Sequence, residues 1–168
     1  MRSLTETEIR DTFVNTTVRE AKQVTLPDLD TIRWDAIEYL GWRDPKRDLL
    51  AYVVAEVDGE LIGIMLRTQP PSPHRKKMMC AWCQDVTIAD PAVLYVAKRA
   101  GASGRKGDTI GTAICASFRC HQNVRRAPSL VEMSGGSEEE KQFWTEQRIA
   151  ELRERAAGFL REVARTGE

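Results

Sequence analysis

The chain has 168 residues, with 25 basic and 25 acidic side chains and a formal net charge of zero. Hydrophobic residues make up 42 % and charged residues 30 %, an ordinary composition for one globular domain. The balance of charge argues against wholesale electrostatic binding of nucleic acid, and no apolar run approaches the roughly 18 residues that span a membrane. The first six residues contain no apolar segment of a secretory signal, so we expect a cytoplasmic protein.

Residues 1–48 predict a helical entry segment. Thr5 and Thr17 each stand three residues before a glutamate, the pattern of a capping box, and each should begin a short helix. Asp30 can cap a further helix with apolar residues at positions 34, 37 and 40, and Gly41 can end it.

Residues 49–127 change to the period of β-strands. Residues 49–57 and 61–66 are separated by Asp58-Gly59, a preferred pair for a tight hairpin turn because glycine tolerates a positive φ. Residues 92–100 and 109–114 predict a second hairpin, and the glycine-rich segment 101–107 predicts the turn between them. Two antiparallel hairpins are therefore expected.

Residues 137–165 predict one long helix that begins with a third capping box. Its apolar stripe favours docking onto the rest of the chain, with docking onto a second copy as the alternative; the stripe consists of Ile149, Leu152, Ala156, Phe159, Leu160 and Val163. Together these elements predict an α+β fold in which residues 1–168 form a single domain with short N-terminal helices, two β-hairpins and a long C-terminal helix.

Four cysteines carry the clearest chemical signal: Cys80 and Cys83, and then Cys115 and Cys120. Two close pairs at this separation are typical of one Zn²⁺ ion with four thiolate ligands. Residues five apart on one helix point in different directions, so Cys115 should end a strand and Cys120 should lie in the first turn of the next helix. Knuckle, hairpin and ligand-bearing helix define a treble clef, and four thiolates leave no open position, so the zinc should be structural.

The four cysteines are also compatible with three other kinds of site. A redox Cys-x-x-Cys pair would favour a thioredoxin-like setting, and two disulfides would conflict with a reducing compartment. An iron–sulfur cluster would fit four cysteines, although these spacings match neither common ferredoxin pattern. His121 adjoins a ligand and is the one plausible substitute, but we expect it not to bind the metal.

Several motifs resemble the C-terminal treble-clef zinc-finger domain of elongation-factor-G-binding proteins, the family of the fusidic-acid-resistance proteins. They span roughly residues 5–165 and include Phe13-Val14-Asn15, Leu40-Gly41-Trp42-Arg43-Asp44-Pro45, Lys98-Arg99-Ala100-Gly101, Gly104-Arg105-Lys106-Gly107 and Gly111-Thr112. The resemblance implies a zinc fold that grips elongation factor G and promotes its release from the ribosome, including under fusidic acid.

The chain also departs from the family in three ways. Only 48 residues precede the first predicted strand, so we expect no counterpart of the family's separate N-terminal helical bundle. Cys120 stands where the resistance proteins carry a histidine. Trp82 lies one position from the expected aromatic residue, where this chain has Ala81, whereas Lys106 matches a basic position of the factor-binding surface.

Basic residues around the second hairpin form the expected partner surface. An acidic protein face or a phosphate backbone would suit such a surface. RNA or ribosome binding is therefore the alternative to binding elongation factor G. The expected residues are Trp82, Lys98, Arg99, Arg105, Lys106 and Arg119. No catalytic constellation stands out, so we expect neither an enzyme nor a small-molecule substrate.

Overall fold

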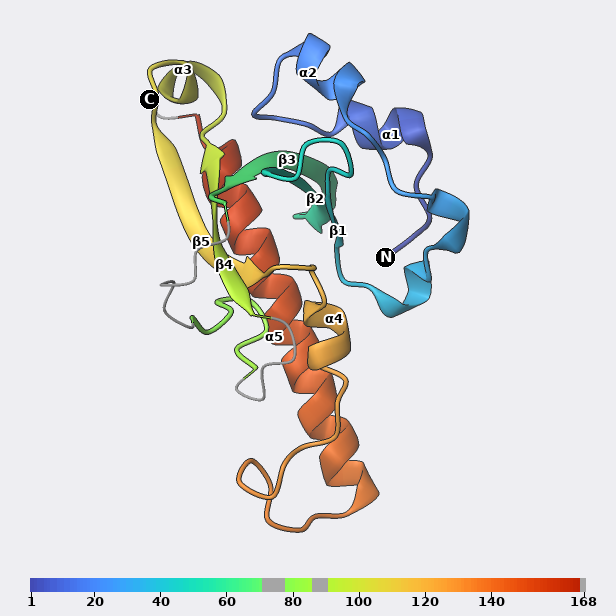
Figure 1. The fold of residues 1–168 in the computed structure, drawn as a ribbon. Coiled ribbons are helices and arrows are strands. Elements are labelled where there is room, and N and C mark those ends of the chain that lie inside the picture. Colours follow the sequence, from blue (N-terminus) through green and yellow to red (C-terminus); the bar gives the residue numbers. More distant parts are fainter. Residues whose placement is uncertain (71–77, 86–90, 167–168) are drawn as a thin grey trace.

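The computed structural model describes residues 1–70, 78–85 and 91–166 (Figure 1). These residues form a five-stranded antiparallel sheet in the order β1-β2-β3-β4-β5. Helix α5, Glu138–Ala164, packs across one face of the sheet against β2 and β3, and the N-terminal segment covers the opposite face (Figure 1). The mixture of helices and antiparallel strands confirms the predicted α+β class.

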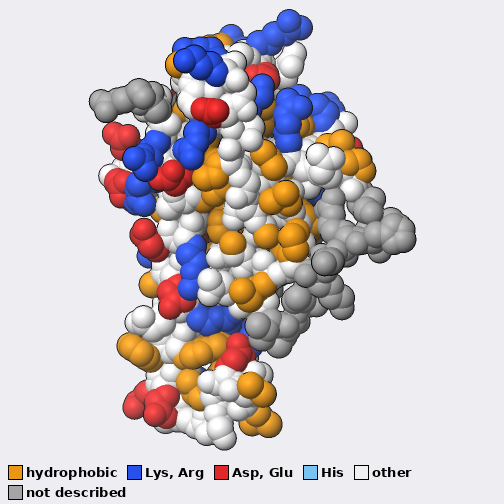
Figure 2. Space-filling model, turned by 90° about the vertical axis from the view of Figure 1, so that its left-hand side faces the viewer, with side chains coloured by type: hydrophobic (Ala, Val, Ile, Leu, Met, Phe, Trp, Pro, Cys, Tyr) orange, Lys and Arg blue, Asp and Glu red, His pale blue; other side chains and the backbone are white. Residues whose placement is uncertain are grey.

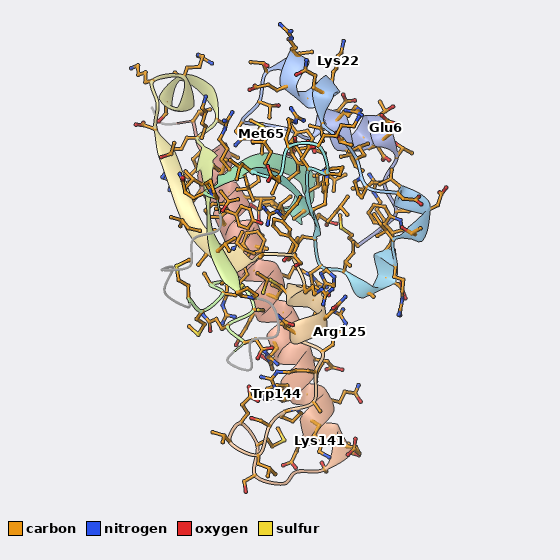
Figure 3. All side chains as sticks on the ribbon, in the orientation of Figure 1. Glu6, Lys22, Met65, Arg125, Lys141 and Trp144 are labelled. Atoms are coloured by element: carbon orange, nitrogen blue, oxygen red, sulfur yellow. The ribbon has the colours of Figure 1, made fainter. Side chains whose placement is uncertain are left out.

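Successive side chains of β2, Leu50–Val57, point to opposite faces of the sheet, and apolar residues are buried on both faces. Ala51, Val53, Ala55 and Val57 belong to the core beneath α5. Tyr52 and Val54, which alternate with them, belong to a second core beneath the N-terminal segment, where Met65 also lies (Figure 3). A strand buried on both faces reads as a nearly continuous apolar run, which is the pattern seen in this stretch.

The two N-terminal capping boxes form as predicted. Helix α1, Glu6–Asp11, begins after Thr5, whose side chain accepts a hydrogen bond from the N–H of Glu8 at 3.3 Å. Helix α2, Val18–Gln23, begins in the same way after Thr17. Both helices are short, and α1 is held to the sheet by Ile9, which is fully buried.

The predicted helix from Asp30 to Gly41 is wrong. The chain makes two 3₁₀ turns, η1 at Leu29–Thr31 and η2 at Trp34–Ala36, and then strand β1 at Leu40–Arg43, which pairs with β2. Side chains here follow period two: Leu40 and Trp42 face one core while Tyr39 faces the other. Gly41 does not cap a helix; it admits the Phe118 ring, which a Cβ atom would meet at 2.7 Å.

Both predicted hairpins are present. Strand β2 turns through Asp58 and Gly59, with φ of 52° and 86°, into β3 at Glu60–Thr68. Strand β4, Ala92–Lys98, pairs with β5, Thr109–Cys115. The connection between them is more than the predicted turn, because residues 101–105 form the one-turn helix α3, Gly101–Arg105.

The C-terminal region closes the fold. Helix α4, Cys120–Asn123, begins at the last cysteine and cannot start earlier at Phe118, because Phe118 has a φ of 57° that a helix does not allow. Helix α5 begins at the predicted capping box, and its apolar stripe packs onto the chain's own sheet rather than remaining free for a second copy. No helix in the described part of the chain is long and apolar enough to cross a membrane.

Candidate metal centre

Three structural elements bring the four cysteines together. Cys80 and Cys83 lie in the tight turn before the second hairpin, Cys115 is the last residue of β5, and Cys120 is the first residue of α4. Their sulfur atoms all lie within 4.8 Å of one another. The sequence predicted these positions for both members of the second pair.

Hydrogen bonds shape the knuckle that carries the first pair. The N–H of Cys83 points to the sulfur of Cys80 at 3.5 Å, and the N–H of Gln84 donates to the carbonyl of Cys80 at 3.0 Å. Gln84 has a φ of 51°, a left-handed conformation that a non-glycine residue seldom adopts. The N–H of Ala81 donates to Ala113 of β5 at 2.8 Å, which fixes the knuckle against the hairpin that delivers Cys115.

The second pair is set by a turn with a similar backbone. The N–H of Phe118 donates to the carbonyl of Cys115 at 3.0 Å, and Phe118 is also left-handed, with a φ of 57°. A bulky residue in this region costs roughly 1–3 kcal/mol. The cost is offset by burial, because the Phe118 ring is 1 % exposed and packs against Tyr95 with ring centroids 5.2 Å apart.

The cluster matches the geometry of a four-thiolate zinc site. Zinc–sulfur bonds of about 2.3 Å in a tetrahedron place neighbouring sulfurs about 3.8 Å apart. The Cys80–Cys120 and Cys83–Cys115 sulfur pairs are each 3.6 Å apart, far longer than the roughly 2.05 Å of a disulfide bond. All four side chains are buried, so the donor set suits one structural zinc ion.

Close packing of the thiols perturbs their protonation. Hydrogen bonds from Cys115 and Cys120 lower the pKa of Cys80 well below that of an ordinary thiol. Hydrogen bonds with Cys115, and then with Cys80 and Cys83, raise the pKa of Cys120. Four neighbouring thiolates repel one another, so full deprotonation calls for a bound divalent cation.

Two neutral polar groups face the sulfurs. The Asn123 amide lies 3.6 Å from the sulfur of Cys83 and 3.4 Å from that of Cys115, and it is oriented to donate to both. The Tyr39 side chain is fully buried beside the cluster; burial first, and then the charge on Cys120, raises its pKa well above the ordinary value. The Asn123 amide can donate to metal-bound thiolates and so stabilise a dianionic site, whereas the Tyr39 hydroxyl makes no hydrogen bond among the described residues.

Trp82 does not belong to an exposed partner surface, contrary to our prediction. Its side chain is 2 % exposed and lies between Tyr39 and Phe159, with ring centroids 4.9 Å and 6.1 Å away. Arg155 of α5 donates to the Trp82 carbonyl at 3.1 Å. Trp82 therefore anchors the knuckle to α5, and nothing near it in the sequence signals this role, because Phe159 is distant along the chain.

The basic residues of the predicted surface fall into two groups. Lys98, Arg99 and Arg105 line one hollow of about 210 Å³, together with residues of the loop before α2. Lys106 follows α3 and is exposed. Arg119 is exposed at the opposite end of β5, just before the last metal ligand, so the structure does not bring it to this hollow.

Arg99 also has a structural role that the sequence does not reveal. Its guanidinium donates to the Glu162 carbonyl at 2.6 Å and approaches the Glu162 carboxylate at 3.5 Å, which ties β4 to the end of α5. Glu20 of α2 lines the same hollow as Arg99, and a hydrogen bond from the Thr17 N–H chiefly lowers its pKa, with smaller effects of Lys98 and Arg67. Lys and Arg side chains gather at this end of the molecule in Figure 2.

His121 is not one of the clustered ligands. It lies next to Cys120, and its Nδ1 atom is buried without a hydrogen-bond partner among the described residues. Lys76 and Lys77, two basic residues shortly before Cys80 in the sequence, lie outside the described residues. The Asn123 amide offsets part of the negative charge on the sulfurs, a role that the sequence alone did not indicate.

The knuckle, the hairpin and the helix that starts at the last ligand define a treble-clef zinc finger with a structural four-cysteine site. Residues 8–163 match the family model of the FBP C-terminal treble-clef zinc-finger, and the chain belongs to this family. The resemblance inferred from the motifs is thereby confirmed. A search of curated proteins found no match.

Proposed function

We propose that this chain is a zinc-stabilised binding module, rather than an enzyme, that associates with translation elongation factor G and promotes its release from the ribosome. Cys80, Cys83, Cys115 and Cys120 are its zinc ligands under this proposal. The family match over residues 8–163 carries the proposal, because the resemblance to factor-binding proteins extends over the same region.

The proposed contact surface is the basic end of the molecule, defined as Lys98, Arg105 and Lys106 with Arg99 beside them. Lys98, Arg105 and Lys106 are exposed, and α3 holds Arg105 and Lys106 on one short turn. An acidic face of a protein partner complements such a surface. Trp82 is buried and therefore lies outside the proposed contact surface.

Zinc acts in this proposal through rigidity alone. The knuckle bonds to β5, and β5 pairs with β4 over seven residues up to Lys98 and Thr109, next to the basic end. Ordering these strands before binding reduces the entropy lost when the partner docks. No reaction on a substrate is involved, and the four buried sulfurs leave no ligand position for a substrate.

Calorimetric titration of the zinc-loaded protein into elongation factor G tests the proposal. We expect binding that Arg105→Ala with Lys106→Ala weakens about tenfold or more, because two charged contacts are lost. Arg153→Ala, a change at an exposed arginine of α5, is the matched control and should leave the affinity unchanged.

Absence of binding at micromolar concentrations, or equal loss in the control, would contradict the proposal. Binding to ribosomal RNA instead, weakened by about one log unit per neutralised phosphate for each tenfold rise in salt, would favour the nucleic-acid alternative. Equal zinc content in all variants must accompany either result.

A further inference from the structure

The far end of α5 carries a second surface whose chemistry differs from that of the basic end. We define the tip as residues 128–147, which comprise the loop after α4 and the first turns of α5. Lys141 and Trp144 mark it at the end of α5 that extends beyond the sheet (Figure 3). A helix of 27 residues is about 40 Å long, and Arg99 contacts its other end, so the two surfaces lie far apart.

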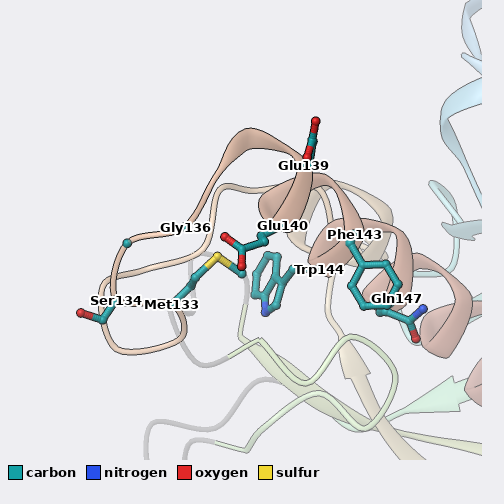
Figure 4. Close-up of a pocket in the computed structure, with 9 residues that line it drawn as sticks. Met133, Ser134, Gly136, Glu139, Glu140, Phe143, Trp144 and Gln147 are labelled. Carbon is teal, nitrogen blue, oxygen red and sulfur yellow. The ribbon is translucent and has the colours of Figure 1, made fainter.

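The tip exposes large apolar side chains. Leu130 is 83 % exposed, Val131 97 % and Phe143 62 %. Met133, Phe143 and Trp144 line a hollow of about 700 Å³ between the loop and the helix (Figure 4). Met133, Phe143 and Trp144 share this one hollow, and an exposed apolar patch on a folded chain often marks an interaction site.

The loop is ordered by polar contacts, so its apolar side chains are held outward rather than collapsed. Glu132 accepts hydrogen bonds from Arg126 at 2.7 Å and 2.8 Å and from the hydroxyl of Ser129 at 2.7 Å. Arg126 also binds Asp85, which follows the zinc knuckle, at 2.8 Å. We call the contacts of Arg126 with Glu132 and Asp85 the clamp, and it connects the tip to the metal centre.

The floor of the hollow is also fixed in place. The guanidinium of Arg148 lies 4.4 Å from the centre of the Trp144 ring, and that of Arg126 lies 5.9 Å away. Both distances fall within the range of cation–π contacts. A preformed apolar site loses little conformational entropy when a partner binds.

The charged residues of the tip indicate which kind of partner fits this surface. The tip contains five glutamates and one lysine, and Arg126 and Arg148 lie against Trp144, so acidic groups exceed basic groups here by two, although the whole chain is neutral. Glu139 and Glu140 line the hollow itself, and Lys141 already pairs with Glu138 at 2.6 Å. An apolar hollow with an acidic border complements a segment that carries apolar residues on one face and Lys or Arg on the other.

We propose that the tip is a docking site for a basic amphipathic helix of a protein partner. Phe143, Met133 and Trp144 receive the apolar face, and the glutamates at the start of α5 attract the cationic face. The nearly fully exposed Leu130 and Val131 extend the apolar contact along the loop. This surface operates independently of the basic end and of elongation factor G.

The probe for this test is a synthetic amphipathic peptide of about 14 leucine and lysine residues, roughly 20 Å long as a helix. Binding to the zinc-loaded chain is followed by calorimetry and by tryptophan fluorescence. We expect Phe143→Ser to weaken binding about tenfold or more, because a buried phenylalanine contact is lost. Val131→Ser, at a side chain with no role in the core, should weaken it several-fold.

Val18→Ser in α2 is the matched control, because Val18 is 74 % exposed outside the tip, and it should bind the peptide like the unaltered chain. Glu139→Lys should weaken binding, and added salt should reduce this difference. A peptide of the same composition without helical periodicity, and one with glutamate in place of lysine, should each bind at least about tenfold more weakly.

Equal binding of the scrambled peptide, or no effect of Phe143→Ser and Val131→Ser, would overturn the proposal, as would absence of peptide binding. Self-association in sedimentation velocity that Phe143→Ser abolishes would assign the tip to a second copy of this chain instead. Phe143-dependent binding to phosphatidylcholine vesicles without peptide binding would assign it to a lipid surface.

Discussion

Asn123 is the polar side chain that most directly adjusts the charge of the metal centre. Its amide approaches two of the four sulfurs, and it stands in the same short helix as Cys120. Neutral donors of this kind commonly change metal affinity by about 10–100-fold when they are removed. The change in zinc affinity should depend on the charge of the group that replaces the amide.

Asn123→Asp should therefore lower zinc affinity by about tenfold or more, because a carboxylate would face thiolates already in negative excess. Competition with a chromophoric zinc chelator measures the change. Gln122→Glu is the matched control, since it adds the same charge one residue away at an exposed position. Equal affinity of Asn123→Asp and the unaltered chain would contradict the role assigned to the amide.

Gly104 has a packing role. A Cβ atom there would lie 1.7 Å from the carbonyl oxygen of Arg99, so α3 cannot accept a side chain at this position without moving. Gly104→Ala should destabilise the chain by about 1–3 kcal/mol, with zinc content retained. Urea unfolding measures the loss; a midpoint equal to that of the unaltered chain would contradict the close approach.

At the scale of elements, α5 contains a glycine that the fold does not require. Gly158 lies inside the helix, and a Cβ atom there would meet only the end of the Arg161 side chain, at 4.0 Å. Gly158→Ala should stabilise the chain by about 0.5–1 kcal/mol, since glycine loses more backbone entropy than alanine in a helix. A higher urea midpoint is the expected result, and a lower one would show that this turn of the helix needs its glycine.

The clamp at the tip should respond to acid through Glu132. Hydrogen bonds from Arg126 lower the pKa of its carboxyl group from the ordinary 4.5 to about 2. A carboxylate whose pKa falls on folding stabilises the folded state above its unfolded value, and this stability is lost as pH falls from about 4.5 toward 2.

Glu132→Gln removes this titration and supplies the comparison. The variant should unfold at lower urea than the unaltered chain at pH 7, and the difference should shrink as pH falls below about 4.5. Loss of zinc in acid affects both proteins, so the difference between them isolates the clamp. A gap in urea midpoint that stays constant from pH 7 to pH 3 would contradict the assignment.

At the scale of the whole molecule, the metal centre adds contacts between the knuckle, β5, α4 and α5 to those made by the sheet and its core. The knuckle bonds to β5 through Ala81, Trp82 packs against Phe159 of α5, and Asp85 reaches Arg126 next to the tip. Arg125, two residues after α4, forms an ion pair with the buried Glu38 at 2.6 Å and so connects this region to the N-terminal segment (Figure 3). Zinc bound at this centre therefore supports the contacts among β5, α4 and α5.

Local signals in the sequence predicted the parts of this fold that local energies decide. Thr5, Thr17 and Ser137 cap helices through neighbours three residues away, Asp58-Gly59 closes its hairpin, and cysteine spacing defines the zinc cluster. Each of these depends on a few adjacent residues, so one sequence suffices.

Long-range packing decided the features that the sequence did not predict. Apolar residues at positions 34, 37 and 40 imitate a helix, but pairing with β2 and the approach of Phe118 make the chain extended from Leu40. The sequence suggested an exposed Trp82 and an unpaired Arg99, but Phe159 packs against Trp82 and the Glu162 carbonyl accepts a hydrogen bond from Arg99. Such contacts join segments whose proximity no short motif encodes.

The most direct test of the account is zinc-edge X-ray absorption on the purified chain, combined with metal content by mass spectrometry. We predict one zinc per chain with four sulfur neighbours at about 2.3 Å and no nitrogen or oxygen ligand. A nitrogen neighbour, which would place His121 in the shell, or a chain that folds with no bound zinc, would contradict the structural four-cysteine site on which the fold and both binding proposals rest.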